Sequence, residues 1–344
     1  MKKPYHILLR LIMLISYLTV SKLINRIKLI LSYLFSFSGF QMKQNIYPVF
    51  VSVEITNYCN LHCPECPVGM GRFSKTKKIS FDSSLYKKLI DELKPTLEHI
   101  ILYFQGEPFL NNQLPELIKL AHDSRIYTST STNGQFLNEK IAKEIVLSGL
   151  DKIIISIDGS TQPVYETYRV SGDLKKAIDG IKYLNDWKKT LKSITPLVEI
   201  QFLVLKTNEH QMKEMRHIVK TIGADRLTFK TAQLYDYESG HVLLTTKDKY
   251  ARYKKDTDGK YKIKNNQPNR CWRLWNGLVI NVKGEILPCC FDKKNDFSFG
   301  NIRDNSVFKI WHNKKASDFR EKILYNRKQI EMCKNCTEGT KVWA

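Results

Sequence analysis

The amino-terminal 53 residues of this chain contain no Asp or Glu, and they also lack a long uncharged run. The uncharged stretches there, of which residues 11–21 and 29–42 are the longest, are shorter than the ~20 residues that a membrane-spanning helix needs. Across the whole chain three catalytic motifs are missing, namely Gly-x-Ser-x-Gly, Gly-x4-Gly-Lys and His-Glu-x2-His. These absences argue against an α/β-type serine hydrolase, a P-loop nucleotidase and a zinc protease of the last motif.

Cysteine is absent between Cys66 and Cys271, and the eight cysteines fall into two blocks on either side of this gap. Small secreted proteins held by disulfides do not show such blocks, whereas tight clusters in a large chain favour bound metal. The 344 residues suffice for about two domains, and 42% hydrophobic with 26% charged residues is ordinary globular usage. Disorder or a fibre is thereby excluded as the main state.

The net charge of +21 invites anionic partners such as nucleic acid or lipid headgroups. Lys is scattered through most of the chain, so a generally Lys-rich composition explains the charge equally well. No array of aromatic residues suited to base stacking accompanies the charge, and nucleic-acid binding therefore rests on charge alone. We do not expect nucleic acid as a partner.

From residue 22 onward the sequence has the pattern of a basic amphipathic helix. Its apolar stripe consists of Leu23, Ile24, Ile27, Ile30, Leu31 and Leu34, and its other face of Asn25, Arg26, Lys28 and Ser32. We predict a helical extension over residues 1–47. Such a helix either lies in the interface of an anionic membrane or packs its stripe on the protein's own body. The sequence predicts a cytoplasmic protein, which meets the inner face of the membrane in the first arrangement.

Between residues 48 and 232, short apolar runs alternate with amphipathic helical patterns. The predicted strands are residues 50–55, 100–104, 126–131, 152–157, 198–205 and 226–229. The predicted helices are residues 84–93, 114–122, 139–147, 174–187 and 211–222. Six strand–helix units predict an α/β fold with a parallel sheet and right-handed crossovers. Because a closed barrel needs eight units, we expect a partial (β/α)6 TIM-type barrel or a doubly wound sheet, with the site at the carboxyl ends of the strands.

The first cysteine block follows the first of these strands. Cys59, Cys63 and Cys66 form a Cys-x3-Cys-x2-Cys motif, and three thiolates this close can hold three irons of a cubane cluster. A structural zinc site is the alternative, with His62 or Glu65 as the local fourth ligand. Three ligands leave one coordination position open, which favours a chemical role for the metal.

This motif resembles the signature of the radical S-adenosylmethionine (SAM) superfamily. The resemblance implies that Cys59, Cys63 and Cys66 hold a 4Fe–4S cluster whose open iron binds SAM. It also implies that one electron cleaves SAM to a 5′-deoxyadenosyl radical, which abstracts a substrate hydrogen. Later motifs follow in the order expected for the family, namely Gln105-Gly106-Glu107-Pro108, Thr132-Asn133-Gly134, Ser156-Ile157-Asp158-Gly159 and Tyr168-Arg169-x2-Gly172.

The resemblance assigns the SAM contacts to residues of these motifs. Gly106 and Glu107 belong to the turn that binds the SAM amino group. Ser156 and Asp158 match residues that approach the ribose, and Arg169 matches one that pairs with the carboxylate. The residue types suit these roles, because Glu accepts hydrogen bonds from an ammonium group and Arg offers a planar fork to a carboxylate.

Two positions depart from the family pattern. Gln105 stands where the family has the first Gly of Gly-Gly-Glu-Pro, and Glu65 stands at a position near the adenine that is often aromatic. After the sixth predicted strand, Tyr235, Asp236 and Glu238 are polar candidates for a proton acceptor beside the substrate, although ordinary loop residues would look the same.

The carboxyl-terminal region contains the second cysteine block. Residues 233–270 are expected to form a linker or loop, and residues 271–344 a small domain around a hairpin of residues 277–288. The cysteine spacing suits zinc or a second iron–sulfur cluster. The order Cys-x12-Gly-x4-Cys, Gly-Asn-Ile, Cys-x2-Cys resembles a SPASM domain that ends before its later cysteines. This resemblance implies one auxiliary 4Fe–4S cluster on Cys271, Cys289, Cys333 and Cys336, with Cys290 as the alternative to Cys289.

The two resemblances together predict a radical SAM oxidoreductase or maturase. Its substrate is expected to be a peptide or protein side chain, as in peptide and sulfatase maturases. A sugar-like alcohol, as in related dehydrogenases with one auxiliary cluster, is the alternative. Flavodoxin or ferredoxin is the expected electron donor. A non-enzymatic zinc protein that binds nucleic acid is the competing class, but it leaves the three-cysteine site and the Gln-Gly-Glu-Pro turn unexplained.

Overall fold

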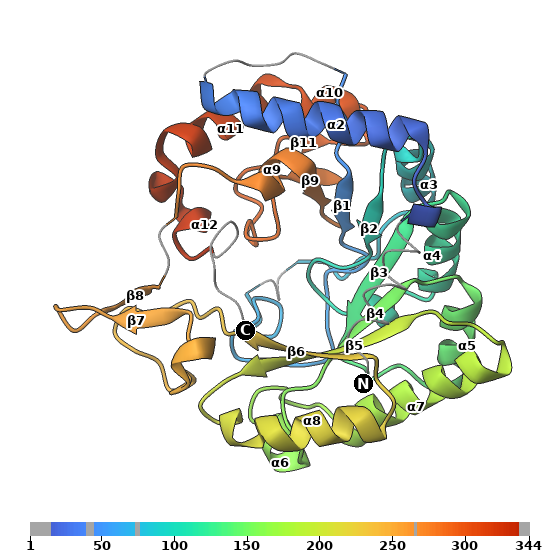
Figure 1. The fold of residues 1–344 in the computed structure, drawn as a ribbon, viewed down its shortest axis with the longest axis vertical. Coiled ribbons are helices and arrows are strands. Elements are labelled where there is room, and N and C mark those ends of the chain that lie inside the picture. Colours follow the sequence, from blue (N-terminus) through green and yellow to red (C-terminus); the bar gives the residue numbers. More distant parts are fainter. Residues whose placement is uncertain (1–14, 39–44, 73–75, 265–266, 337–344) are drawn as a thin grey trace.

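The computed structural model describes residues 15–38, 45–72, 76–264 and 267–336 (Figure 1). Its main feature is a sheet with the strand order β11-β10-β9-β1-β2-β3-β4-β5-β6. These strands are β1 (Phe50–Val53), β2 (His99–Ile101), β3 (Tyr127–Thr132), β4 (Lys152–Ser156), β5 (Leu197–Val204), β6 (Arg226–Thr231), β9 (Gly277–Ile280), β10 (Glu285–Leu287) and β11 (Gly300–Asn301).

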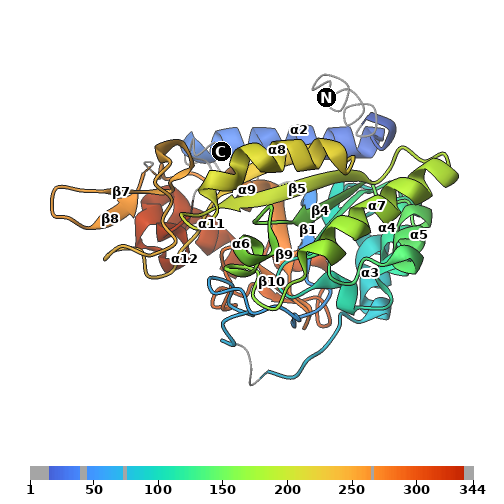
Figure 2. The same cartoon turned by 90° about the horizontal axis from the view of Figure 1, so that it is seen from below.

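Strands β1 to β6 are parallel and lie side by side in chain order, which confirms the predicted partial barrel. Helices cross over between successive strands on the outer side of the sheet (Figures 1 and 2). They are α3 (Ser83–Leu93), α4 (Leu114–Asp123), α5 (Glu139–Leu147), the short α6 (Gln162–Glu166), α7 (Leu174–Thr190) and α8 (Met212–Thr221). This arrangement brings the carboxyl ends of all six strands to one side of the sheet.

Capping residues explain where several of these helices begin. Asp82 accepts hydrogen bonds from the backbone of the first turn of α3, and Asn138 does the same for α5. Asp173 caps α7 by accepting from the Lys176 N–H at 3.2 Å. Each cap satisfies a backbone donor that has no partner inside the helix.

The cysteine-rich region is joined to the barrel through the sheet itself. Strand β9 pairs in parallel with β1, in the register Phe50↔Gly277 to Val53↔Ile280, and the β9–β10 hairpin extends this edge. Around it lie α9 (Trp272–Asn276), α10 (Val307–Trp311), α11 (Lys314–Asn326) and α12 (Glu331–Lys334). Buried side chains from both regions form one continuous hydrophobic core.

The polar stretch expected to be a linker or loop contains a two-stranded antiparallel sheet, β7 (Tyr253–Lys255) and β8 (Tyr261–Ile263). Its inner face is aromatic, because the Tyr253 ring stacks on Tyr237 with centroids 4.3 Å apart. The Tyr253 hydroxyl also donates to the Asn335 side chain at 2.8 Å. These contacts anchor the sheet to the cysteine-rich region and correct the expectation of an irregular loop.

The predicted amino-terminal helix is confirmed over α2 (Val20–Phe35), and residues 1–14 of the predicted extension lie outside the described residues. Helix α2 lies along the outer edge of the molecule (Figure 1), where it contacts the segments that precede β1, β2 and β3 and also helix α9. None of the helices in the described ranges is long and apolar enough to cross a membrane.

Candidate functional site

The first cysteine block lies on the loop that follows β1, at the carboxyl end of the sheet. Within it the Cys66 N–H donates to the Cys63 carbonyl at 3.1 Å, and the Leu61 N–H points at Cys59 Sγ at 3.4 Å. Burial raises the pKa of the Cys59 thiol to about 12. Among the described residues, no three His, Cys, Asp or Glu side chains converge as ligands of a single metal ion would. A cubane cluster needs no such convergence, because each thiolate binds a different iron.

The Gln-Gly-Glu-Pro turn, which follows β2, packs directly under this loop. The Glu107 N–H donates to the Tyr58 carbonyl at 2.8 Å, next to Cys59 in the chain. Gly106 has a left-handed backbone with φ of +69°, and a Cβ placed on it would lie 2.3 Å from the Thr56 carbonyl oxygen. Only glycine therefore permits the turn and the cysteine loop to approach this closely.

Glu107 is a buried carboxylate that joins three strand ends. It accepts hydrogen bonds from Thr132 Oγ1 at 2.7 Å and from the Asn133 N–H at 2.8 Å. Burial raises its pKa to about 7, against the opposing effect of these hydrogen bonds. Asn133 Nδ2 in turn lies 3.6 Å from Cys59 Sγ. The first three predicted motifs are thus in mutual contact.

Asp158 and Arg169, which the sequence assigned separately to the ribose and the carboxylate of SAM, are paired with each other. Arg169 Nε donates to Asp158 Oδ2 at 2.6 Å, while the Leu203 N–H donates to Asp158 Oδ1 at 2.6 Å. Asp158 is fully buried, so both of its oxygens are engaged by the protein. Ser156, at the end of β4, is half-buried.

The free end of Arg169 points toward the cysteine loop, with Nη1 3.7 Å from Cys63 Sγ. Burial lowers the pKa of Arg169, but Asp158 and Cys63 more than offset this effect and keep it well above its usual value. Arg169 therefore carries a permanent positive charge beside the cysteines.

The second cysteine block also forms one site. Cys271, Cys289, Cys333 and Cys336 line the same small cavity, together with Arg327. Burial is the main cause that raises the pKa of Cys289 well above its ordinary value, and it raises that of Cys333 to about 11. The neighbouring thiol, Cys290, instead packs against the buried group of Phe104, Val279 and Leu287.

Both cysteine sites match known family models. Residues 53–217 match the radical SAM superfamily, and residues 271–337 match SPASM, an iron–sulfur cluster-binding domain. The chain belongs to the radical SAM superfamily. This assignment decides between the iron–sulfur enzyme and the zinc protein in favour of the enzyme.

Similar proteins are known for almost the whole length of this radical SAM enzyme. A tungsten-containing aldehyde ferredoxin oxidoreductase cofactor-modifying protein of Pyrococcus furiosus is 22% identical over 79% of this chain and 83% of its own length. The PqqA peptide cyclase of Bradyrhizobium diazoefficiens is 26% identical over 84% of this chain and 78% of its own. Streptococcus suis SuiB bound to its precursor peptide SuiA has a similar fold, with a TM-score of 0.61 and 15% identity over 86% of this chain and 72% of that chain.

The superfamily and its SPASM domain imply a 4Fe–4S cluster, SAM and auxiliary cluster binding. The residues present fit these groups. Three cysteines stand on one loop beside a glycine that has no room for a side chain and an arginine whose guanidinium end reaches Cys63. Four further cysteines line one cavity.

Several residues that support the cysteine sites escaped the sequence analysis. Gln267 Nε2 donates to the carbonyls of Cys333 and Cys336, at 2.6 Å in both cases, and so fixes the last Cys-x2-Cys turn. Arg327 is buried, with Nη2 3.4 Å from Cys336 Sγ. Neither residue stands in a motif, although Gln267 lies four residues before Cys271 and Arg327 six residues before Cys333. Only the folded chain reveals them.

The polar residues after β6 are brought together with the cysteine loop only in part. The Tyr235 N–H donates to Glu65 Oε2 at 3.0 Å, and His241 Nε2 lies 3.3 Å from the other oxygen of Glu65. Asp236 and Glu238 are exposed and have no described contact with the cysteine loop. Glu65, which departs from the family pattern, is thus a link between the cysteine loop and the chain after β6.

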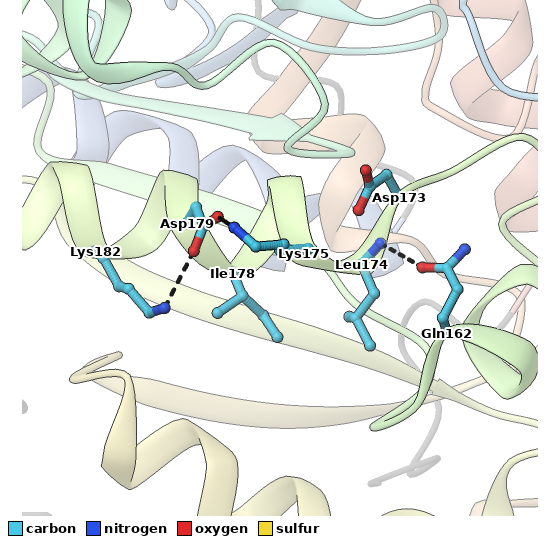
Figure 3. Close-up of a pocket in the computed structure, with 7 residues that line it drawn as sticks. All are labelled: Gln162, Asp173, Leu174, Lys175, Ile178, Asp179 and Lys182. Carbon is cyan, nitrogen blue, oxygen red and sulfur yellow. Dashed lines mark hydrogen bonds and ion pairs between the residues drawn. The ribbon is translucent and has the colours of Figure 1, made fainter.

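A surface hollow along α7 lies apart from both cysteine sites (Figure 3). Its lining charges are satisfied locally, since Lys175 and Lys182 both bind Asp179. The Gln162 side chain accepts from the Leu174 N–H at 2.8 Å. We assign no function to this hollow.

Proposed function

We propose that this enzyme modifies a side chain of a peptide or protein by abstracting a hydrogen atom from it. The observation that carries this proposal is the meeting of three strand-end motifs and Arg169 around the Cys59–Cys66 loop. Two similar proteins support the substrate class, because one is named a PqqA peptide cyclase and the other was solved with its precursor peptide SuiA. When bound, the cluster and SAM supply a carbon radical able to abstract an unactivated hydrogen.

We assign Cys59, Cys63 and Cys66 as ligands of the SAM-binding cluster. Gly106 lets the turn lie directly against the cysteine loop, and the buried Glu107 carboxylate is an acceptor suited to the SAM amino group. These assignments are supported by the contacts that hold the turn against the cysteine loop.

We assign the guanidinium end of Arg169 to the SAM carboxylate, beside the amino group, and Ser156 to the ribose. Asp158 is a positioning residue in this assignment, although the family pattern places it at the ribose. Its two oxygens already hold Arg169 and the Leu203 N–H, and a buried ion pair of this kind fixes the direction of the guanidinium.

We propose that Cys271, Cys289, Cys333 and Cys336 hold one auxiliary 4Fe–4S cluster, which takes an electron from the substrate or binds it. Flavodoxin or ferredoxin would deliver the electron that starts the reaction. The reducing cytoplasm suits both clusters, because free thiolates persist there. Arg327 supports this assignment by placing a positive charge next to Cys336.

The cluster assignment is tested by counting iron and sulfide in protein reconstituted without oxygen. About eight irons are expected for two four-iron clusters, and about four after Cys289→Ala or after Cys59, Cys63 and Cys66 are replaced together. Cys290→Ala is the matched control and should keep about eight. Loss of iron in Cys290→Ala but not in Cys289→Ala would reverse the assignment of these neighbours.

The substrate assignment is tested with short peptides encoded beside the gene, synthesised with deuterium in their side chains. Reduced enzyme and SAM should give 5′-deoxyadenosine that contains deuterium, measured by mass spectrometry. Arg169→Lys should lower this yield, because an ammonium group cannot replace the planar fork. Deuterium transfer from a labelled sugar alcohol and from none of the peptides would support the dehydrogenase alternative.

A further inference from the structure

Helix α2 is attached to the rest of the protein through its polar face. Asn25 bonds both backbone groups of Tyr47: its Nδ2 donates to the carbonyl at 3.0 Å, and its Oδ1 accepts from the N–H at 2.9 Å. Lys22 Nζ donates to the Arg125 carbonyl, and Arg26 forms an ion pair with Glu98. Lys22 is only 1% exposed. These specific contacts fix the rotation of the helix about its axis.

The apolar stripe predicted from the sequence consequently faces away from the protein. We call these residues the outer stripe: Leu23, Ile24, Ile27, Ile30, Leu31 and Leu34. Their exposed fractions lie between 39% and 56%. More than half of the large hydrophobic side chains exposed in the described part of the chain fall between Ile15 and Phe37. The alternative in which the stripe packs on the protein's own body is therefore wrong for these residues.

Such an arrangement is unfavourable in water. A helix on the surface of a water-soluble protein normally turns its apolar side inward, because burial of each large aliphatic side chain is favourable. Here the buried residues of α2 are Lys22, Asn25 and Leu29, so that a single aliphatic side chain is buried while six remain outside. The outer stripe thus calls for an apolar environment that the described chain does not supply.

The charge around the stripe favours anionic lipid as that environment. Residues 1–53 contain no acidic side chain, and the whole chain has a net charge of +21. Lys28 and Arg26 flank the stripe on the two sides of α2. A second copy of this basic chain would be repelled, whereas an anionic bilayer surface attracts it.

The shape and rim of this surface agree with a lipid interface. The stripe follows a single helix of 16 residues, about 24 Å long, which is too short to span a bilayer but suited to lying along it. Trp272 of the neighbouring helix α9 is partly exposed, with its ring centroid 5.0 Å from that of Tyr33 in α2. Tryptophan and tyrosine favour the boundary between headgroups and acyl chains.

We propose that α2 docks the enzyme on the surface of an anionic membrane, with the outer stripe among the lipid acyl chains. Because the polar face of α2 is held by the barrel, docking would fix the orientation of the whole enzyme on the membrane. This inference is independent of the proposed substrate.

The test is flotation of the reconstituted holoenzyme, without oxygen, with vesicles of phosphatidylglycerol and phosphatidylcholine. The wild type should float with these vesicles, and less with pure phosphatidylcholine. The double variant Ile27→Gln/Leu31→Gln should bind about tenfold more weakly, equivalent to about 1.4 kcal/mol. The matched control Leu147→Gln/Val242→Gln changes two equally apolar exposed residues elsewhere and should float like the wild type.

Iron content and 5′-deoxyadenosine formation should be unchanged in both variants, which separates docking from folding and from catalysis. A wild type that stays out of the vesicle fraction, or an α2 variant that floats as well as the wild type, would overturn the proposal. So would light scattering that finds a wild-type dimer without vesicle binding, together with a monomeric α2 variant, because the stripe would then hold a second copy.

Discussion

Gly106 is the residue whose missing side chain lets the Gln-Gly-Glu-Pro turn approach the cysteine loop so closely. Gly106→Ala would place a methyl group 2.3 Å from the Thr56 carbonyl oxygen, in a left-handed backbone as well. We expect it to lower the free energy of unfolding by about 3 kcal/mol or more. Urea unfolding of the cluster-free protein measures this loss.

The control for this prediction is Gly259→Ala. Gly259 has a similar φ of +78°, but the nearest atom to an added Cβ is a flexible lysine carbon 3.9 Å away. Gly259→Ala should therefore lower the free energy of unfolding only through backbone strain, by about 1 kcal/mol. Equal losses in the two variants would show that the clash with Thr56 is relieved by a small shift of the loop.

Glu107 predicts a specific dependence of stability on pH. Its pKa rises from 4.5 to about 7 in the folded protein, mainly through burial. Between these values the folded state therefore holds a proton that the unfolded chain has released, and the free energy of unfolding falls as the pH rises. Glu107→Gln should remove the contribution of this carboxyl group to the pH dependence of the free energy of unfolding, which amounts to at most about 1.4 kcal/mol per pH unit.

The measurement is urea unfolding of cluster-free protein at several pH values through this window. Glu54 offers an internal comparison, because burial also raises its pKa to about 7 and it lies in a separate contact, accepting from the Val282 N–H at 2.8 Å. Glu54→Gln should remove a second, additive part of the slope. An unchanged slope in Glu107→Gln would mean that its carboxyl group is ionised throughout.

At the scale of elements, the alternating strands and helices of the barrel were predictable, whereas the pairing of β9 with β1 and the β7–β8 hairpin were not. Alternation of apolar runs and amphipathic helices located all six barrel strands, because each is a local pattern. The pairing of β9 with β1 joins residues more than 200 positions apart, and no local pattern encodes it. The β7–β8 hairpin was missed because its strands are short and rich in lysine, and its tyrosines find their partners only in the folded chain.

The same distinction holds for the site. Cysteine spacing and the order of strand-end motifs located the groups that meet, since parallel strands bring their carboxyl ends together. Which partner each side chain takes was not visible in the sequence. Asp158 and Arg169 were given separate ligands, yet they bind each other, and Gln267 supports a cysteine turn from within a polar stretch.

The attachment of α2 is an element-scale property that one side chain should control. Asn25→Ala leaves the backbone N–H and carbonyl of Tyr47 without these hydrogen-bond partners in a buried place, at a cost of about 1–3 kcal/mol. Amide hydrogen exchange in α2 should then become about tenfold faster or more. Ile24→Ala, on the exposed outer stripe, is the control and should leave exchange in α2 unchanged. Equal exchange in the Asn25 variant and the wild type would show that other contacts hold the helix.

At the scale of the whole molecule, the two cysteine sites are parts of one sheet and one core. Leu278, Ile286 and Trp311 from the cysteine-rich region belong to the same buried cluster as Val51 and Ile100 of the barrel. Gln105 links the Gln-Gly-Glu-Pro turn directly to the loop that follows Cys290, since its Nε2 donates to the Lys293 carbonyl at 3.1 Å. The two sites are therefore joined by a shared packed core and not by a flexible linker.

This continuity predicts that the barrel does not fold alone. A chain truncated after residue 270 loses β9, which leaves one edge of β1 unpaired and the apolar faces of Val51 and Ile100 short of neighbours. We expect aggregation or loss of cooperative thermal unfolding, measured by light scattering and circular dichroism. Truncation after residue 336 is the matched control, because it keeps every contact described above and should unfold like the full chain. If the shorter chain remained monomeric with an unchanged unfolding midpoint, the two regions would be independent domains, and the sheet between them would be only a docking surface.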